Sequence, residues 1–199
     1  YQQALSLGAD IVMHSSTKYI SGHSDILGGI LVTKEQDSFW ERIKNVQRLA
    51  GAVPSPMDCY LLTRSIKTLP YRMRAHTHNA GKIADFLNSR VEVEKVFYPG
   101  LSDHEGFETA KKQMSGFGAM LSFLIKGNAN DADRLIGKLK YFTDATSLGG
   151  VESLIERRSK VQAGDAGIPD QLIRMSVGIE NCDDLIEDLT QAFDSIYKD

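Results

Sequence analysis

The stretch "ADIVMHSSTKYISGHSDILGG", residues 9–29, decides how the rest of the chain is interpreted. It begins as an apolar run with β-branched members, which predicts a buried strand over residues 9–15. It then changes at once to small, hydroxylated and charged residues, among them Ser15, Thr17 and Lys18, and it ends on a pair of glycines. Surface loops have this composition, and so do sites that hold an anionic cofactor.

The overall composition is that of a globular protein with its own core. The 199 residues are 42% hydrophobic and 25% charged, and the net charge is −3. Basic and acidic residues are interspersed, so nothing favours a nucleic acid or an anionic membrane as partner. No apolar run approaches the about 18 residues that a membrane helix needs. Cys59 and Cys182 are far apart and lack CxxC spacing, which favours a reducing, cytoplasmic setting.

The first part of the chain predicts two strands followed by helices. The second apolar run predicts a strand over residues 28–34, and helical spacing predicts a helix over 37–51 that ends at a glycine. Residues 54–89 are typical of a long helical stretch, which Pro70 should kink or split. We expect a domain boundary there, with residues 1–70 and 71–199 on either side.

The second part changes rhythm after residue 90, and strands alternate with helices. We expect strands over 91–99, 118–127 and 172–178, and helices over 107–114, 130–142 and 182–197. This alternation indicates an α/β or α+β layered domain. The chain starts at Tyr1 in what has the character of the middle of an element, so we expect it to be the C-terminal part of a longer polypeptide.

The segment "SSTK" has residue types that suit a phosphate-bearing aldehyde. Ser15 and Thr17 offer hydroxyl donors to a phosphate, and the Lys18 amine can form a Schiff base when it is held partly unprotonated. Pyridoxal 5'-phosphate (PLP) has both halves. The pattern is short, however, and a loop lysine beside a Ser/Thr turn is the alternative interpretation. A phosphate-ester enzyme would need a metal-binding carboxylate cluster, and we identify no metal site in the sequence.

The segment around Lys18 resembles the PLP-lysine segment of the Cys/Met-metabolism PLP enzymes, the cystathionine γ-lyase/γ-synthase group. Further segments occur in the order of that family: "AGAVPSPMDCYLLTRSIKTLPYRMRAHTHNA", "VEKVFYPGL", "SGFGAMLSFLIKG", "TSLGGVESLIE" and "LIRMSVGIE". The resemblance covers nearly the whole chain. It implies the α/β fold of PLP-dependent transferases of fold type I, with the end of the large domain followed by the small C-terminal α+β domain.

The resemblance also implies roles for particular residues. Lys18 matches the lysine that binds PLP covalently and moves protons, and Ser15 and Thr17 match the hydroxyls that bind its phosphate. Ser147 matches a serine near the substrate carboxylate and the lysine, and Arg174 matches the arginine that binds the substrate α-carboxylate. From the residues alone, a guanidinium in an apolar strand is equally compatible with a structural ion pair.

Two departures from the family pattern bear on the substrate. Thr146 stands where the γ-lyases and γ-synthases have a glutamate, and residues 157–171 replace a "HPA…THAS"-like segment. We expect a different rim there, with Arg157 and Arg158 on a solvated face. The resemblance implies γ-elimination or γ-replacement on cystathionine, a related sulfur amino acid or an activated homoserine. Methionine γ-lyase-like or cystathionine β-lyase-like activity and a non-enzymatic, truncated relative remain as alternatives. Family members are usually tetramers built from dimers.

Overall fold

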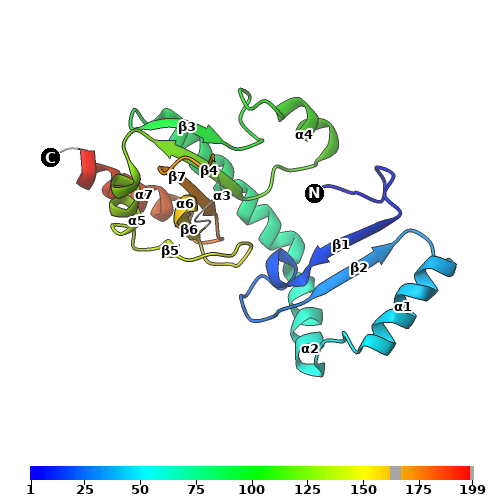
Figure 1. Cartoon of the computed structure of the whole chain (residues 1–199). Helices are drawn as coiled ribbons and strands as arrows, with labels where there is room; N and C mark the ends of the chain where they lie inside the picture. Colours follow the sequence, from blue (N-terminus) through cyan, green and yellow to red (C-terminus); the bar gives the residue numbers. More distant parts are fainter. Residues whose placement is uncertain (162–166, 198–199) are drawn as a thin grey trace.

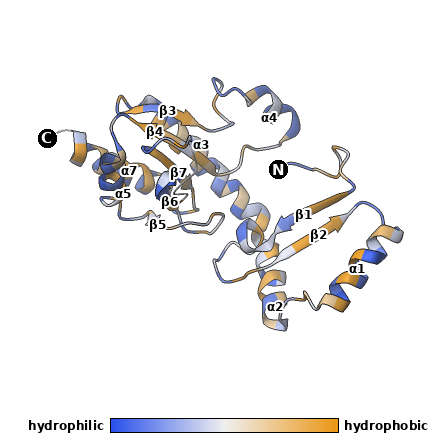
Figure 2. Ribbon diagram, in the orientation of Figure 1, coloured by the Kyte–Doolittle hydropathy of each residue, from blue (hydrophilic) through white to orange (hydrophobic). Residues whose placement is uncertain are grey.

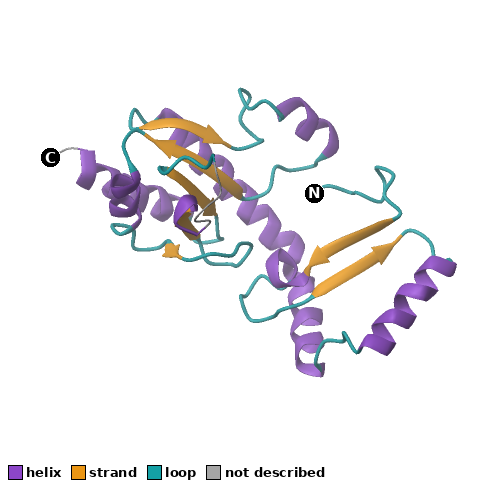
Figure 3. Ribbon diagram, in the orientation of Figure 1, coloured by secondary structure: helices purple, strands orange, loops and turns teal. Residues whose placement is uncertain are grey.

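The structure is a computed structural model that describes residues 1–161 and 167–197. A small two-stranded sheet with helices α1 and α2 lies at one end of the molecule, and a larger five-stranded sheet lies at the other (Figure 1). The long helix α3 (Leu69–Ser89) runs from one to the other. Figure 3 shows the same division by element type, with the helices of the second part gathered around the larger sheet.

The two-stranded sheet pairs β1 (Ile11–Ser15) with β2 (Gly29–Thr33) in antiparallel fashion, and Ser15 lies opposite Gly29. Both predicted strands are confirmed, but the expectation that the first is buried was wrong, because no residue of β1 is buried by the described part of the chain. Figure 2 shows apolar residues along both strands. Several of these side chains are exposed, including Met13 on β1 and Leu31 and Val32 on β2. Neighbouring residues of a strand point to opposite faces, so both faces of this sheet present apolar surface.

Helices α1 (Ser38–Ala50) and α2 (Pro56–Ser65) begin and end where the sequence indicates. Asp37 caps the N-terminus of α1, and Gly51 ends it in the left-handed conformation at φ 72°. The expected split of the long stretch is confirmed, because a 3-10 turn (Ile66–Thr68) separates α2 from α3. Pro70 lies in the first turn of α3, where its missing N–H costs no helical hydrogen bond.

The five-stranded sheet has the order β3-β4-β7-β6-β5. Its strands are β3 (Val93–Phe97), β4 (Met120–Ile125), β5 (Thr143–Asp144), β6 (Leu154–Arg157) and β7 (Leu172–Ser176). All neighbours are antiparallel except β5 and β6. The predicted strands β3, β4 and β7 are confirmed, whereas β5 and β6 were not expected.

One face of this sheet forms the core against α3, α5 (Ala129–Ile136) and α7 (Cys182–Tyr197). Alternate residues of β4 and β7, such as Phe123 and Met175, are fully buried there. The remaining helices are α4 (Phe107–Gln113) and α6 (Arg158–Val161). Among the described residues, no helix combines the length and the apolar character that crossing a bilayer requires.

The helix expected over residues 130–142 is shorter in the structure, and α5 ends at Ile136. The peptide N–H groups of Lys140 and Tyr141 donate instead to the carboxylate of Asp188 on α7, at 2.8 to 3.0 Å. This buried carboxylate offers the segment after α5 an alternative to helical hydrogen bonds. The prediction was wrong at this end because the competing acceptor lies far away in the sequence.

Candidate active site

Lys18 lies in a short, irregular helical segment (Ser16–Ile20) that follows β1 directly. Its φ and ψ of −95° and −133° are non-helical and interrupt this segment. The Lys18 Nζ donates a hydrogen bond to Ser147 Oγ at 2.9 Å. The fold thus brings together two predicted site residues that are 129 positions apart in sequence.

The hydroxyls before Lys18 have different surroundings. The Thr17 hydroxyl accepts a hydrogen bond from Gly28 N at 3.1 Å and lies 3.4 Å from the Gly28 carbonyl, so it closes the loop between β1 and β2. Ser16 is buried beside Gly28, where an added Cβ would lie 2.7 Å from Ser16 Oγ. Ser15 is exposed, and its hydroxyl makes no hydrogen bond to any described residue. It therefore remains available to an anionic ligand.

Ser147 lies in a tight loop between β5 and β6. Its φ of 116° is unusual for a residue other than glycine, and such strain persists only where the surroundings impose it. Gly149 has φ 79°, and an added Cβ there would lie 2.7 Å from the Tyr19 backbone nitrogen. Its own N–H donates to Ser176 Oγ at 2.9 Å. The loop is thus fixed directly against the segment that carries Lys18.

Arg174 points from β7 toward the same loop. Its Nη2 donates to the Ser147 carbonyl at 2.9 Å, and its Nε lies 3.0 Å from Glu156 Oε1. Burial lowers the pKa of Arg174, while the carboxylate of Glu156 opposes that shift. Arg174 is therefore ion-paired, and it binds the same residue that Lys18 binds. Its binding of a substrate carboxylate stays a prediction.

The sequence did not lead us to single out Glu156, and it led us to expect the neighbouring Arg157 and Arg158 on a solvated face. Glu156 is buried and binds Arg158 Nη1 at 2.8 Å in addition to Arg174. Arg157 pairs with Asp133 at 2.9 Å, and its side chain is only 15% exposed. The expectation of a solvated face for Arg157 and Arg158 was wrong, because both guanidiniums have carboxylate partners. A lone glutamate in the run "SLIE" was the one signal available.

A cavity of about 540 Å³ opens between the loop after Lys18 and the loop after β5. Its polar lining comes from both loops, and the Ser24 hydroxyl donates to the Glu152 carboxylate across it. The lining residues with polar side chains are Thr17, Ser24, Asp25, Thr143, Thr146, Ser147 and Glu152. The departure at Thr146 therefore lies in the cavity wall. The replaced segment 157–171 includes residues 162–166, which lie outside the described residues.

The residues present fit PLP in chemical type. A Schiff base requires a lysine amine that can reach the aldehyde, and a phosphate requires free hydroxyl or N–H donors beside it. Lys18 and Ser15 meet these requirements three residues apart. Arg174 adds a cation suited to a carboxylate.

Comparison with known proteins identifies the family. The family model for Cys/Met metabolism PLP-dependent enzymes matches residues 1–194. Cystathionine gamma-lyase from Dictyostelium discoideum is 48% identical, over 98% of this chain and 52% of its own length. Cystathionine gamma-synthase from Mycobacterium tuberculosis (strain ATCC 25618 / H37Rv) is 50% identical, over 96% of this chain and 50% of its own length.

The fold is shared with solved structures of similar proteins. The crystal structure of cystathionine gamma-lyase from Lactobacillus plantarum complexed with L-serine has a TM-score of 0.90 and 43% identity, and it covers 98% of this chain and 53% of that chain. The chain thus spans about half the length of the relatives it matches. The chain belongs to the family of Cys/Met metabolism PLP-dependent enzymes.

Proposed function

We propose that the polypeptide containing this chain is a PLP-dependent trans-sulfuration enzyme. It acts on cystathionine, a related sulfur amino acid or an activated homoserine by γ-elimination or γ-replacement. One observation carries the proposal: Lys18 Nζ and Arg174 Nη2 bind the hydroxyl and the carbonyl of the same residue, Ser147, at 2.9 Å each. An amine and a carboxylate-binding cation are thus held close together, as an amino-acid substrate requires.

Each proposed residue has a separate task. Lys18 holds PLP through its Nζ, and Ser15 and Thr17 bind the phosphate with their hydroxyls. When bound, PLP accepts the electron pair of the bond that is broken at the substrate α-carbon. The Lys18 amine would take a proton from one substrate carbon and return it to another. The Ser147 hydroxyl orients this amine, and Arg174 binds the α-carboxylate with its guanidinium.

A second candidate is a methionine γ-lyase or a cystathionine β-lyase type of C–S lyase. Thr146 favours it, because the cavity wall has a hydroxyl where the resemblance led us to expect a carboxylate for a distal substrate amine. T146E should then raise the preference for cystathionine over methionine. A non-enzymatic relative is disfavoured by the presence of Lys18, Ser15 and Arg174 together.

We also propose how the chain is organised in the native protein. Residues 1–70 would complete a large PLP-binding domain that covers the exposed apolar faces of β1 and β2, and residues 71–199 would form the small domain. The relatives, at about twice the length, and the apolar exposure support this division. We expect a cytoplasmic homotetramer built from dimers, and negligible turnover by the 199 residues alone.

Borohydride trapping tests the proposed function. The native polypeptide would be incubated with PLP, reduced, digested and analysed by mass spectrometry, with the intact mass recorded in the same run. We expect a pyridoxyl group on the peptide that carries Lys18, and its loss in K18A. Lys34, an exposed lysine beyond β2, provides the matched control variant K34A, which should keep the label. Absence of label on Lys18 in the native polypeptide would overturn the proposal.

A further inference from the structure

Glu156 and Arg174 occupy directly opposite positions on neighbouring antiparallel strands. The register of β6 and β7 pairs Glu156 with Arg174, and Leu154 with Ser176. These residues point away from the helical core, since the residues between them, Ile155, Ile173 and Met175, belong to that core. The ion pair thus lies on the sheet face that carries Ser176, the side chain that binds the loop beside Lys18.

The carboxylate of Glu156 is buried to an unusual degree for a glutamate, with 2% of its side chain exposed. Its Oε1 accepts a hydrogen bond from Arg158 Nη1 at 2.8 Å, and it forms an ion pair with Arg174, whose Nε lies 3.0 Å away. Its Oε2 is buried without a hydrogen-bond partner among the described residues. Burial of a carboxylate costs free energy unless it is paired. The two guanidiniums that pair with Oε1 therefore determine where the Glu156 carboxylate lies.

The Arg174 guanidinium has several N–H groups that make no hydrogen bond to a described residue. Nε is bound to Glu156, and Nη2 uses one hydrogen on the Ser147 carbonyl. Two N–H groups on Nη1 and one on Nη2 make no hydrogen bond to any described residue. An arginine offers five N–H groups in a planar fork, and such a fork can bind a carboxylate in bidentate fashion.

We infer that Glu156 is a positioning residue, which fixes the plane of the Arg174 guanidinium so that its Nη1–Nη2 edge faces the substrate carboxylate. This inference rests on the proposed function. Glu156 itself does not contact the substrate, and it acts through its ion pair with the Arg174 guanidinium. Arg158 shares the Glu156 oxygen, so the cluster of two guanidiniums and one carboxylate keeps a net charge of +1. The cluster therefore still attracts an anion.

Two conservative variants separate the position of the oxygen from its charge. E156D keeps the charge but withdraws the oxygen by one methylene, whereas E156Q keeps an oxygen in place without the charge. The probes are L-norvaline, which has no γ-leaving group, and L-norvalinamide, which lacks the carboxylate. Their dissociation constants would be measured by calorimetry and by the PLP spectrum, with the native polypeptide loaded with PLP.

The measured quantity is the ratio of the dissociation constant of L-norvalinamide to that of L-norvaline. We call this ratio the preference for norvaline. Hydrogen bonds to charged groups correspond to a factor of about 10 to 100 in binding, and we expect a preference of this size in the unaltered protein. E156D should reduce it at least about fivefold, while E156Q should keep more than half of it. An unchanged preference in E156D, or a smaller preference in E156Q than in E156D, would overturn the inference.

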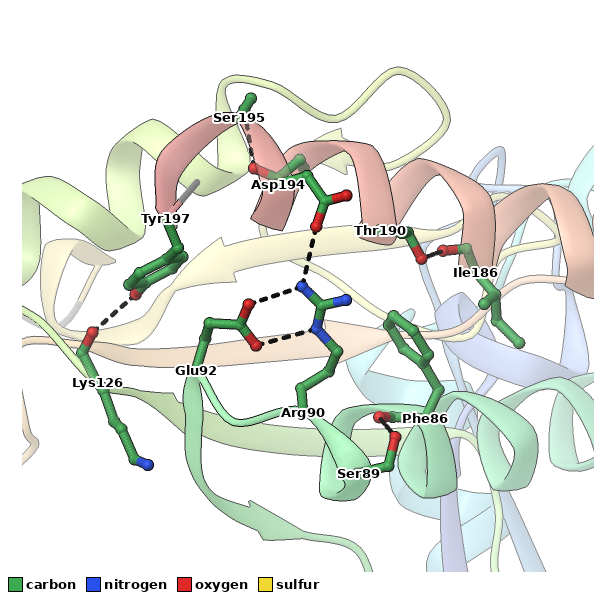
Figure 4. A network of polar contacts seen from close by, with 11 residues as sticks. Phe86, Ser89, Arg90, Glu92, Lys126, Ile186, Thr190, Asp194, Ser195 and Tyr197 are labelled. Carbon is green, nitrogen blue, oxygen red and sulfur yellow. Dashed lines mark hydrogen bonds and ion pairs between the residues drawn. The ribbon is translucent and has the colours of Figure 1, made fainter. Parts of the chain in front are cut away.

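Glu92 provides a matched control for the same change of side chain. Its carboxylate binds the guanidinium of Arg90 at 2.8 Å, and its side chain is 12% exposed (Figure 4). This pair lies beyond the end of α3 that is remote from β1 and β2. E92D should lower the melting temperature without changing the preference.

If the unaltered protein binds neither probe, the proposed function itself fails. Normal binding with an unchanged preference in E156D overturns only the role of Glu156.

Discussion

Arg72 on α3 donates a hydrogen bond from Nη1 to the backbone carbonyl of Tyr19, the residue after Lys18, at 2.7 Å. Its Nη2 donates to the carbonyls of Ile20 at 3.2 Å and Ser65 at 3.0 Å. The side chain is buried, and that burial lowers the pKa of Arg72. The segment that carries Lys18 is therefore attached to α3 by one guanidinium that binds neutral carbonyl groups.

Replacement of Arg72 by methionine tests this attachment. R72M keeps the apolar stem but removes the donor to the carbonyls of Tyr19 and Ile20, while the Ser65 carbonyl still accepts from the Thr68 hydroxyl. Each buried unsatisfied group costs about 1–3 kcal/mol. We expect the free energy of unfolding to fall by about 3 kcal/mol in urea denaturation, and PLP to be lost more readily on dialysis. R74M, on an exposed position of the same helix, is the control. Equal stability of R72M and R74M would contradict the attachment.

Gly22 tests the same contact from the other side. An added Cβ at Gly22 would lie 2.0 Å from Arg72 Nη1, and the residue also has φ 69°. We expect G22A to displace the guanidinium and to destabilise the protein by more than the about 1 kcal/mol that a positive φ costs alone. Gly51 has nearly the same φ, 72°, with no atom within 4 Å of an added Cβ, so G51A isolates the backbone cost. The difference between the two melting temperatures measures the clash.

Arg158 should affect the binding of a carboxylate ligand through its charge. Its side chain pairs with Glu156 and does not line the cavity. R158Q leaves the Glu156–Arg174 pair neutral, so a carboxylate ligand loses the attraction of one partly screened charge. We expect the dissociation constant of norvaline to rise about threefold at low salt, and less at high salt. R157Q removes a neighbouring arginine that pairs with Asp133, and it should leave norvaline binding unchanged. A salt-independent loss in R158Q would argue for a structural effect.

Much of the fold follows from local sequence signals. Strands β1 and β2 are continuous apolar runs with β-branched residues, and α1 ends at a glycine that takes the left-handed conformation. Pro70 marks the start of α3 because a proline fits the first turn of a helix. These signals depend on neighbouring residues alone, so they can be read without the fold.

The elements and residues that were missed depend on distant partners. Strand β6 contains Glu156 and Arg157, whose charges interrupt its apolar pattern and are paired with the distant residues Arg174 and Asp133. The proximity of Lys18 to Ser147 followed from the family resemblance, because no local pattern connects residues so far apart. A charged residue of this kind becomes part of a buried site only when folding brings its distant partner next to it.

His76 should make stability depend on pH. It is fully buried, its Nδ1 lies 2.7 Å from the Val177 carbonyl, and burial lowers its pKa from 6.5. The unfolded chain therefore binds a proton more readily than the native one, so stability is full above pH about 6.5 and falls as the pH drops below it. One such group contributes at most about 1.4 kcal/mol per pH unit.

The variant H76N isolates that contribution, because an asparagine amide can donate to the Val177 carbonyl without titrating. We expect the free energy of unfolding of H76N to decrease less between pH 7 and pH 5 than that of the unaltered protein. H78Q removes an exposed histidine of the same helix and serves as the control. Parallel pH curves for H76N and the unaltered protein would show that His76 does not titrate on unfolding.

Arg90, at the end of α3, connects three parts of the second sheet's core. It binds Glu92 before β3 at 2.8 Å and Asp194 on α7 at 3.2 Å, and its guanidinium lies over the rings of Phe86 and Phe193 (Figure 4). R90M removes both ion pairs and leaves Glu92 mostly buried, for which about 3–5 kcal/mol is typical of fully buried pairs. Because Asp194 is partly exposed, we expect a loss of about 2 kcal/mol in urea denaturation.

The exposed pair of Lys44 and Glu41 at 2.6 Å provides the comparison, and K44M should cost less than about 0.5 kcal/mol. Similar losses in R90M and K44M would show that burial adds nothing to the Arg90 contacts.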